Sequence, residues 1–243
     1  MRYSSITNQG DREHNEDSLV CLENGSHSCF VVADGLGGHG RGEVASALVT
    51  DVFARQFSSW SDTSVDQFLH ETICLAQEEL LAEQKRLGAK SEMKTTLVAL
   101  CADANNMCWA HVGDSRLYAF RRNKVRLRTL DHSVPQMLVL AGDIKEKQIR
   151  NHPDRNRLLR VMGIEWDNPQ YEVAEVIPVK NYQAFLLCSD GFWELIEEKQ
   201  MGALLKKSSS PQEWLLQMEE IVKKNGQGKN MDNYTAVAVF CSE

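Results

Sequence analysis

Cysteine pairs are missing from this sequence. Its seven cysteines are scattered, and no two of them are spaced as C-x-x-C. Disulfide scaffolds and zinc ribbons depend on such pairs, so neither class of protein is expected. Most of the seven lie in apolar runs, where a free cysteine behaves as a small buried hydrophobe, and none has the electropositive neighbours of a reactive thiolate. We therefore expect reduced thiols that carry no chemistry.

Long apolar runs and a positive net charge are missing as well. No stretch is long and apolar enough to span a bilayer, and residues 1–5 contain no apolar signal region, so we expect no membrane partner and a cytoplasmic location. The net charge of -7 argues against a nucleic-acid partner, although it leaves room for a local basic patch. The composition is that of a soluble globular protein, and 243 residues suit one sizeable domain.

The hydrophobic pattern predicts helices in groups and strands in antiparallel runs. Apolar residues at helical spacing predict amphipathic helices over 43–58 and 64–86. Ser210-Pro211-Gln212-Glu213 is a capping box that opens a further helix. Between 95 and 130, short strands with short connections predict an antiparallel meander. The expected fold class is therefore α+β rather than a series of βαβ units.

One buried strand ends in an acid followed by glycines, at Asp34-Gly35-Leu36-Gly37-Gly38-His39-Gly40. Glycine lets the backbone turn sharply and approach a ligand closely. The stretch also satisfies G-x-G-x-x-G, the dinucleotide fingerprint. Against that interpretation, Asp34 would place a negative charge where a pyrophosphate binds, and Asp51, the acid nearest to the expected ribose ligand, falls inside a helical pattern. A metal-binding turn and a plain structural turn remain.

Acids at the tips of apolar strands recur along the chain. They are Asp34-Gly35, Asp114-Ser115, Asp190-Gly191 and Asp232-Asn233, with Glu16-Asp17 just before another strand. A single aspartate at such a place is usually a turn former. If the tips converge, however, the carboxylates repel one another unless cations neutralise them. Oxygen ligands favour Mg²⁺ or Mn²⁺, and no set of cysteines or histidines suggests zinc.

A pair of such ions would suit the hydrolysis of a phosphate ester. Two ions that share a carboxylate can bridge a water, lower its pKa and direct it at phosphorus. This chemistry needs a positive group on the phosphoryl oxygens. Arg12 lies four residues before Glu16 and its planar fork suits the task, although a plain surface arginine is equally compatible with the sequence.

Several motifs stand in the order found in one known family. They are Arg12-x-x-Asn15-Glu16-Asp17, Asp34-Gly35-Leu36-Gly37-Gly38-His39-Gly40, Thr95-Thr96, Val112-Gly113-Asp114-Ser115-Arg116, Asp131-His132-Ser133, Ser189-Asp190-Gly191 and Asp232-Asn233-x-Thr235. Over essentially its whole length the chain resembles the metal-dependent serine/threonine protein phosphatases of the 2C type (PPM family), in their bacterial branch. The resemblance implies an α-β-β-α sandwich of two antiparallel sheets flanked by helices. It also implies a single catalytic domain over 1–243 with a flap at about 131–170.

The resemblance further implies two Mn²⁺ or Mg²⁺ ions per site, with a third position. The implied metal ligands are Glu16, Asp17, Asp34, Gly35, Asp114, Asp190 and Asp232. Asp34 would bridge the two ions beside the Gly35 carbonyl. Asp190 and Asp232 would complete one ion and Glu16 the other.

The remaining implied roles are less direct. Asp17 would hold waters around the ions, and Asp114, with Asp190 and Glu194, would offer the third position. Arg12 would bind the substrate phosphate. His39 is a candidate general acid for the leaving seryl or threonyl oxygen, and a histidine that merely orders the turn is an equal alternative.

Two positions depart from the family pattern. Lys94 stands where the family usually has glycine, so we expect either backbone strain at a positive φ or added positive charge in the cleft. Asn8 stands where the family often has aspartate. In the flap, four arginines surround His152-Pro153, and we expect this basic stretch to help select phosphoproteins; they are Arg150, Arg155, Arg157 and Arg160.

The expected function is metal-dependent hydrolysis of phosphoserine and phosphothreonine in proteins, opposing a bacterial Ser/Thr kinase. The expected partners are phosphorylated proteins, such as that kinase and its substrates. Two alternatives stay open. One is a non-catalytic relative that binds phosphoproteins, for which only Lys94 argues; the other is an enzyme of the same fold that acts on a small phosphate ester.

Overall fold

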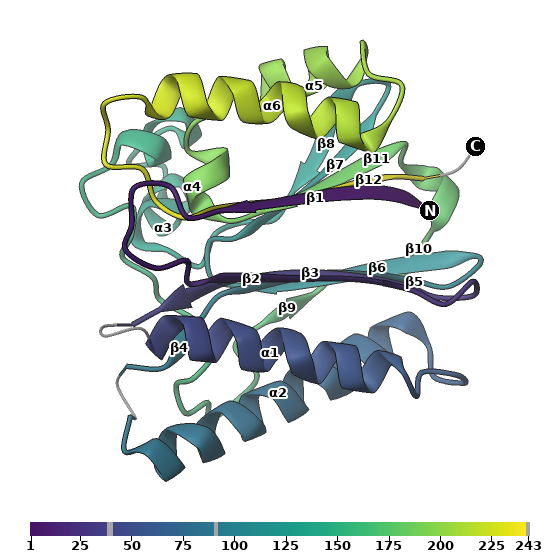
Figure 1. The fold of residues 1–243 in the computed structure, drawn as a ribbon, viewed down its shortest axis with the longest axis vertical. Coiled ribbons are helices and arrows are strands. Elements are labelled where there is room, and N and C mark those ends of the chain that lie inside the picture. The colour runs from purple at the N-terminus through teal and green to yellow at the C-terminus, as the bar shows by residue number, and fades with distance from the viewer. Residues whose placement is uncertain (38–40, 90–91, 242–243) are drawn as a thin grey trace.

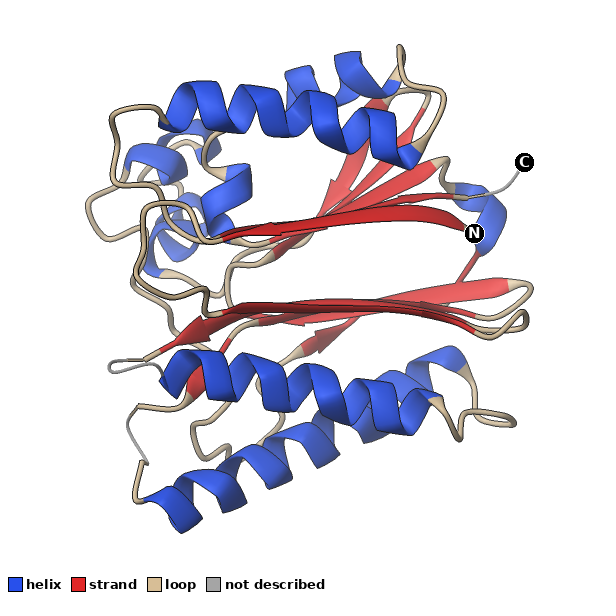
Figure 2. Cartoon of the chain, viewed as in Figure 1, coloured by secondary structure: helices blue, strands red, loops and turns tan. Residues whose placement is uncertain are grey.

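Two antiparallel sheets lie face to face, and helices cover the outer face of each (Figures 1 and 2). The computed structural model describes residues 1–37, 41–89 and 92–241. In spatial order the first sheet contains β1 (Arg2–Asn8), β12 (Tyr234–Phe240), β11 (Ala184–Cys188), β7 (Arg116–Arg121) and β8 (Lys124–Arg128). The second contains β10 (Ile177–Pro178), β6 (Asn106–Val112), β5 (Leu97–Ala102), β3 (Ser28–Leu36) and β2 (Asp17–Glu23). Two short strands extend the second sheet: β4 (Lys94–Thr95) pairs with β3, and β9 (Glu172–Val173) pairs with β6.

The helices form the outer layers of the sandwich. α1 (Arg41–Phe57) and α2 (Val65–Leu87) cover the second sheet, and α5 (Glu198–Leu205) and α6 (Pro211–Gly226) cover the first. The segments near one end of the sheets carry α3 (Val134–Ala141), the 3-10 helix η1 (Glu146–Asn151) and α4 (Asp190–Trp193); η2 (Val179–Asn181) lies at the other end. None of the helices in these described ranges has the length and apolar character needed to cross a bilayer.

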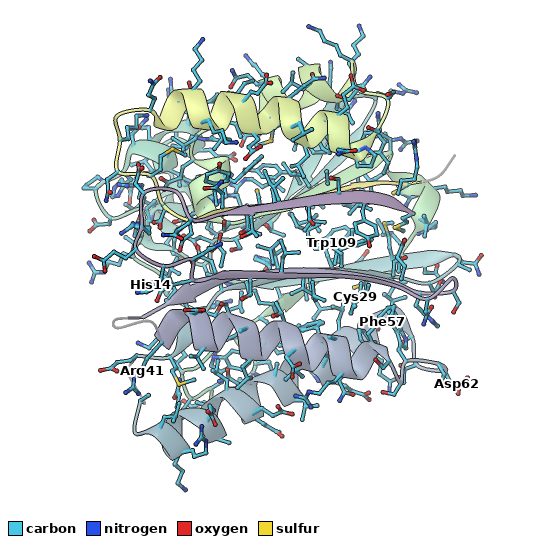
Figure 3. The ribbon with its side chains drawn as sticks, in the orientation of Figure 1. His14, Cys29, Arg41, Phe57, Asp62 and Trp109 are labelled. Carbon is cyan, nitrogen blue, oxygen red and sulfur yellow. The ribbon has the colours of Figure 1, made fainter. Side chains whose placement is uncertain are left out.

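Three apolar layers hold the sandwich together, and β3 shows why. Its residues Cys29 and Val31 pack toward α1 and α2, whereas Phe30 and Val32 pack between the sheets. Successive strand residues face opposite sides, so a strand that is covered on both faces must be apolar throughout. In Figure 3, Trp109 lies between the two sheets.

The predicted helices over 43–58 and 64–86 are confirmed as α1 and α2. At α6, the Oγ of Ser210 accepts a 3.1 Å hydrogen bond from the Glu213 N–H, as the capping box predicts. The reciprocal bond is different, because the Glu213 carboxylate accepts from the N–H of Ser209 instead of Ser210. The cap therefore reaches one residue further back along the chain.

The predicted meander over 95–130 is wrong in one respect: its four strands do not share a sheet. β5 pairs with β6 in the second sheet, and β7 pairs with β8 in the first. The chain changes sheets between β6 and β7, where Gly113 has a φ of 99°, a conformation that glycine adopts without a Cβ clash. As a result Asp114 lies where the two sheets meet.

The candidate active site at the end of the sandwich

The predicted site residues converge on one cleft of about 720 Å³ at the end of the sandwich that His14 marks in Figure 3. Its lining includes the sequence-predicted residues Arg12, Glu16, Asp34, Gly35, Asp114, Asp190 and Asp232. Asp17 is buried and is the cross-strand partner of Asp34. His39 lies outside the described residues. The strand tips that carry these acids therefore come together, with Asp17 buried beside Asp34.

Asp34 is fixed by its backbone rather than by its own carboxylate. The Asp34 N–H donates to the Thr96 hydroxyl (3.0 Å), and the Asp34 carbonyl accepts from the Thr96 N–H (2.9 Å) and the Thr95 hydroxyl (2.8 Å). Thr95 ends β4 and Thr96 links it to β5, and both of these strands pair with β3. The Asp34 side chain lines the cleft beside that of Asp190.

Gly35 allows the N-terminal loop, β3 and α1 to meet closely. A Cβ at this position would lie 2.3 Å from the Gly42 carbonyl oxygen and 2.5 Å from that of Glu16. Real Cβ atoms do not approach backbone so closely, so only glycine fits. The Gly35 N–H also donates to the Glu16 carbonyl (3.1 Å), which places Glu16 beside Asp34.

The C-terminal acids are pressed together in the same way. A Cβ on Gly191 would lie 2.1 Å from the Asn233 carbonyl oxygen, so the start of α4 rests against the segment that leads into β12. Asn233 then ties that segment to the N-terminal loop. Its Oδ1 accepts from the Glu16 N–H (2.8 Å), and its Nδ2 donates to the carbonyls of Gln9 (2.7 Å) and His14 (2.9 Å).

Burial and mutual repulsion raise the pKa values of these carboxyl groups. Burial raises the pKa of Asp34 well above its ordinary value, and the charges of Asp17, Asp190 and Asp114 raise it further. Burial raises the pKa of Asp190 to about 7, with added repulsion from Glu194 and other acids. The site therefore holds more negative charge than its protein surroundings compensate.

Asp114 lies at the crossing between the two sheets. Its side chain is buried, and burial followed by repulsion from Asp190 raises its pKa well above the ordinary value. The Trp193 indole donates a 3.0 Å hydrogen bond to the Asp114 carbonyl. The Arg116 guanidinium lies 3.3 Å from the centre of the Trp193 ring and donates to both carboxylate oxygens of Asp131, at 2.7 and 2.6 Å. This buried assembly supports the turn that carries Asp114.

Arg12 lies in the cleft and donates to Asp232 Oδ2 at 2.7 Å. Its side chain is 45% exposed, so it keeps further donors that face solvent. A guanidinium with free donors beside a group of carboxylates is placed to meet an anion that enters the cleft.

The residues present fit a hard divalent cation. Asp17 Oδ1 is buried without a hydrogen-bond partner, while Ser189 donates to its Oδ2. A buried oxygen without a partner is costly unless a cation or an ordered water satisfies it. All the predicted side-chain donors in the cleft are carboxylates, which suits Mg²⁺ or Mn²⁺.

One cluster outside the predicted set also resembles a metal site. In the described ranges, only His111, His132 and Glu172 bring three ligand atoms within 4.8 Å of one another. Hydrogen bonds already use three of the four ring nitrogens. His132 Nδ1 accepts from the Gly113 N–H (3.3 Å), which puts the proton on Nε2, and that nitrogen faces Glu172 at 3.2 Å. His111 Nε2 bonds to the Leu130 carbonyl at 2.8 Å, so this cluster acts as a structural tie between strands.

The two departures from the family pattern have a plain structural outcome. Lys94 is not among the non-glycine residues with positive φ, which in the described chain are Arg122 and Asn123, so the expected strain is absent. Lys94 is in β4 opposite Leu36 and is not among the residues that line the cleft. Asn8 accepts from the Gly10 N–H at 3.0 Å and so forms a turn.

The four flap arginines do different things. Arg150 donates to the carbonyls of Trp193 and Ile196 and to Glu198, so it is a structural anchor rather than a substrate contact. Arg155 pairs with Glu194 at 3.0 Å, and Arg157 is exposed. Arg160 lies 3.9 Å from Glu172. The segment 131–170, which we expect to be a flap, borders the cleft through Asn156 and Leu158.

Sequence reasoning gave no role to two residues that the site needs. Ser189 holds Asp17, and Asn233 ties the two termini together. Both lie beside predicted ligands, Asp190 and Asp232. That adjacency was the available signal, because a hydroxyl or amide next to a buried carboxylate commonly serves as its hydrogen-bond partner.

Known proteins share both the sequence and the fold of this chain. A model of the family described as protein phosphatase 2C matches residues 7–232. Serine/threonine phosphatase stp of Listeria welshimeri is 34% identical over 237 residues, which cover 94% of this chain and 90% of that protein.

Two solved structures extend the comparison. Serine/threonine phosphatase Stp1 from Staphylococcus aureus is 27% identical with a TM-score of 0.90, and the match covers 100% of this chain and 96% of that one. The catalytic domain of serine threonine protein phosphatase PstP, in complex with 2 manganese ions, is 25% identical with a TM-score of 0.80, over 98% of this chain and 96% of that one. The expected α-β-β-α sandwich is thereby confirmed. The chain belongs to the protein phosphatase 2C family of hydrolytic enzymes, in its bacterial branch.

Proposed function

We propose that this chain, as a single catalytic domain over 1–243 with a flap at about 131–170, removes phosphate from phosphoserine and phosphothreonine in proteins and so opposes a bacterial Ser/Thr kinase. The observation that carries the proposal is the convergence of Glu16, Asp34, Asp190 and Asp232 on one cleft, with burial raising the pKa of three of them. The names of the relatives support the substrate class.

The proposed ligand set contains Glu16, Asp17, Asp34, the Gly35 carbonyl, Asp114, Asp190 and Asp232. When bound, two Mn²⁺ or Mg²⁺ ions supply the charge that activates a water for direct attack on phosphorus. Asp34, whose pKa is raised by the charges of both Asp17 and Asp190, would be the ligand that the two ions share. Asp114, with Asp190, would offer the third position.

The protein's own residues position the substrate. Arg12, exposed at the rim and already beside Asp232, holds the phosphoryl oxygens with its free donors. His39 stays a proposal for the general acid that protonates the leaving oxygen.

The test is hydrolysis of an aryl phosphate with Mn²⁺, with EDTA, and by Asp34→Asn and Asp190→Asn. Both substitutions remove a charge without removing volume, so we expect folded proteins that have lost metal-dependent turnover. Asp62→Asn is the matched control, because Asp62 is exposed on the loop between α1 and α2, at the other end of the molecule (Figure 3). Turnover that resists EDTA or survives both cleft substitutions would refute the two-ion site.

A second measurement separates the proposed substrate class from the alternatives. Phosphothreonine peptides should be hydrolysed with a higher kcat/KM than small phosphate esters. A preference for the small ester would support the enzyme of the same fold acting on metabolites. Binding of phosphopeptides without hydrolysis, in folded and metal-loaded protein, would support the non-catalytic relative.

A further inference from the structure

A groove lined by arginines lies at the end of the sandwich opposite the cleft. It has a volume of about 520 Å³ and is lined by Arg121, Arg122, Arg126, Asn181 and Tyr182. The strands β7 and β11 run from one of these ends to the other. β7 begins just after Asp114 and ends at Arg121, and β11 begins just after Tyr182 and ends just before Asp190. A strand of six residues spans roughly 20 Å, so this distal groove is separate from the catalytic cleft.

The arginines are held on a fixed framework. Arg122 and Asn123 form the two-residue turn between β7 and β8, with φ of 53° and 56°. The Asn123 N–H donates to Gln183 Oε1 (3.0 Å), and Gln183 Nε2 donates to Asn123 Oδ1 (2.7 Å). The hairpin is therefore tied to the start of β11, which carries the other wall of the groove.

Two backbone features place arginines where other residues would be easier. A left-handed φ strongly favours glycine or asparagine, so Arg122 costs about 1 kcal/mol of strain at its position. Arg126 is the extra residue of a bulge, because Phe120 pairs with Val125 and Ala119 with Leu127. A bulge redirects a side chain out of the regular pattern of the strand.

The arginines of the groove differ from other surface arginines in their ion pairs. Within the part of the chain that the structure describes, Arg121, Arg122 and Arg126 take part in no ion pair. Arginines elsewhere on the surface, such as Arg55 and Arg86, pair with neighbouring carboxylates. A concentrated positive charge in a protein of net charge -7 is a local exception.

Protection of a sheet edge explains only part of this pattern. β8 is an edge strand, and charged residues on an edge discourage pairing with another chain. That accounts for Arg126, but Arg121 belongs to the inner strand β7, and the hollow beside it is closed by Asn181 and Tyr182. The groove is thus a recess with cationic walls rather than a charged edge alone.

We propose that the distal groove binds an acidic segment of the phosphoprotein substrate, away from the phosphorylated residue itself. This proposal rests on the proposed phosphatase function. Guanidinium groups pair with carboxylates through two parallel hydrogen bonds, so three of them favour a run of aspartate or glutamate. No exposed large apolar side chain lines the groove to enter a bilayer. The proposed substrate of this chain is a protein, so we choose an acidic segment of that protein as the occupant.

The first experiment measures binding without any phosphate. A fluorescent peptide of eight glutamates is titrated with the wild type and with Arg121→Gln/Arg126→Gln at low salt, and anisotropy is read. Loss of two exposed ion pairs should weaken binding by about tenfold. Lys85→Gln/Lys224→Gln is the control, since it removes the same charge from exposed lysines on α2 and α6. Equal binding by all three proteins would overturn the proposal.

The second experiment tests whether binding in the groove lowers the KM of the phosphatase reaction. A phosphothreonine peptide with an acidic run about ten residues away can reach both sites, since extended chain spans about 3.3 Å per residue. Its KM should be lower than that of the same peptide without the acidic run, and Arg121→Gln/Arg126→Gln should abolish the difference. Turnover of an aryl phosphate should be unchanged in this variant.

The outcomes separate the two proposals. Normal aryl-phosphate turnover, with no effect of the acidic run on the KM for the phosphopeptide, would refute the proposed role of the groove. The proposed phosphatase function would stand. The opposite result would be absent turnover together with binding of the glutamate peptide that depends on Arg121 and Arg126. It would refute the proposed phosphatase function and support the binding of acidic segments in the groove. Binding of anionic vesicles or of an oligonucleotide, but not of the glutamate peptide, would also contradict an acidic peptide as the occupant.

Discussion

The Ser189 hydroxyl donates a 2.7 Å hydrogen bond to Asp17 Oδ2 and accepts one from the Thr235 N–H at 3.0 Å. Together these two bonds fix the direction in which the Ser189 hydroxyl donates. The other oxygen of the Asp17 carboxylate, Oδ1, has no hydrogen-bond partner. Ser189 therefore orients a proposed metal ligand whose second oxygen is buried and unpaired, in the way that outer hydrogen bonds orient metal ligands in general.

Ser189→Ala should weaken the binding of Mn²⁺ by about 10- to 100-fold, because Asp17 loses the bond that aims it. The measurement is the activity as a function of Mn²⁺ concentration. We expect the Mn²⁺ concentration that gives half-maximal activity to rise strongly, and kcat at saturating Mn²⁺ to change less. Ser210→Ala is the matched control: Ser210 caps α6, so its loss costs about 1 kcal/mol of stability without touching the cleft. Equal metal affinity in both variants would remove Ser189 from the site.

The metal-free protein should lose stability as pH rises from about 4 to about 7. Burial raises the pKa of Asp17 to about 6 and that of Asp190 to about 7 in the folded state, above the value of about 4 in the unfolded chain. The folded state then binds more protons in this window, so its stability is full at low pH and is lost as these groups ionise. Mn²⁺ should consequently raise the melting temperature more at pH 7.5 than at pH 5.5.

The titration of His132 changes stability with pH in the opposite direction, so its effect must be separated from that of the carboxyl groups. Burial lowers its pKa to about 4, so the stability that it contributes falls as pH drops from about 6.5 toward 4. The measurement that isolates the carboxylates is the difference in unfolding free energy between wild type and Asp190→Asn, without metal, across pH 4 to 7.5. A difference that does not change with pH would show that Asp190 ionises normally in the fold.

Asp131→Asn should destabilise the protein by about 3–5 kcal/mol. The side chains of Arg116 and Asp131 are 2% and 1% exposed, and removal of one partner leaves an unpaired buried charge. Urea unfolding measures the change. Arg55→Gln is the control, because its ion pairs with Asp51 and Glu79 are on the surface and contribute less than about 1 kcal/mol each. Similar losses in both variants would show that burial does not decide the effect.

The sequence predicted the acids of the site because each one interrupts an apolar strand at its end. Asp34 and Asp190 could be placed at strand tips from local pattern alone, and the family motifs supplied the expectation that the tips meet. What local pattern could not supply was the crossing at Gly113, where the chain leaves one sheet for the other. Strand pairing over short loops favours a meander, and only the packing of both sheets against helices decides otherwise.

The positioning residues were harder to predict than the ligands. Asn233 bonds to Glu16, 217 residues away, and Ser189 bonds to Asp17, 172 residues away. Serine and asparagine near a turn commonly bond to the backbone of that turn. The presence of either residue type in the sequence therefore gives no sign of a distant partner. Lys94 shows the reverse case. Its departure from the family pattern predicted either backbone strain or added charge in the cleft, yet its φ is not positive and it does not line the cleft.

Lys94→Gly should therefore bring no gain. The backbone at Lys94 has no positive φ to relieve, and glycine within a strand costs roughly 0.5–1 kcal/mol through its greater freedom in the unfolded chain. Metal-dependent turnover should stay unchanged while the unfolding free energy falls slightly. Gly113→Ala is the contrasting variant: φ is 99° and a Cβ would lie 2.6 Å from the Thr96 methyl, so it should lose more stability. A rise in activity of Lys94→Gly would restore the idea that this lysine restrains the site.

Arg155→Gln/Arg157→Gln should raise the KM for a short phosphopeptide and leave the KM for an aryl phosphate unchanged. Both residues are exposed in the flap, on either side of Asn156, which lines the cleft, so a peptide that leaves the cleft passes them. Arg155 gives up its surface pair with Glu194 to bind a peptide, which limits its own contribution to about 1 kcal/mol. The peptide carries no acidic run, so the distal groove has no part in the result. Lys85→Gln/Lys224→Gln removes the same charge away from the flap and should match the wild type. Equal increases of KM for both substrates would mean that the flap arginines shape the cleft instead of reading the peptide.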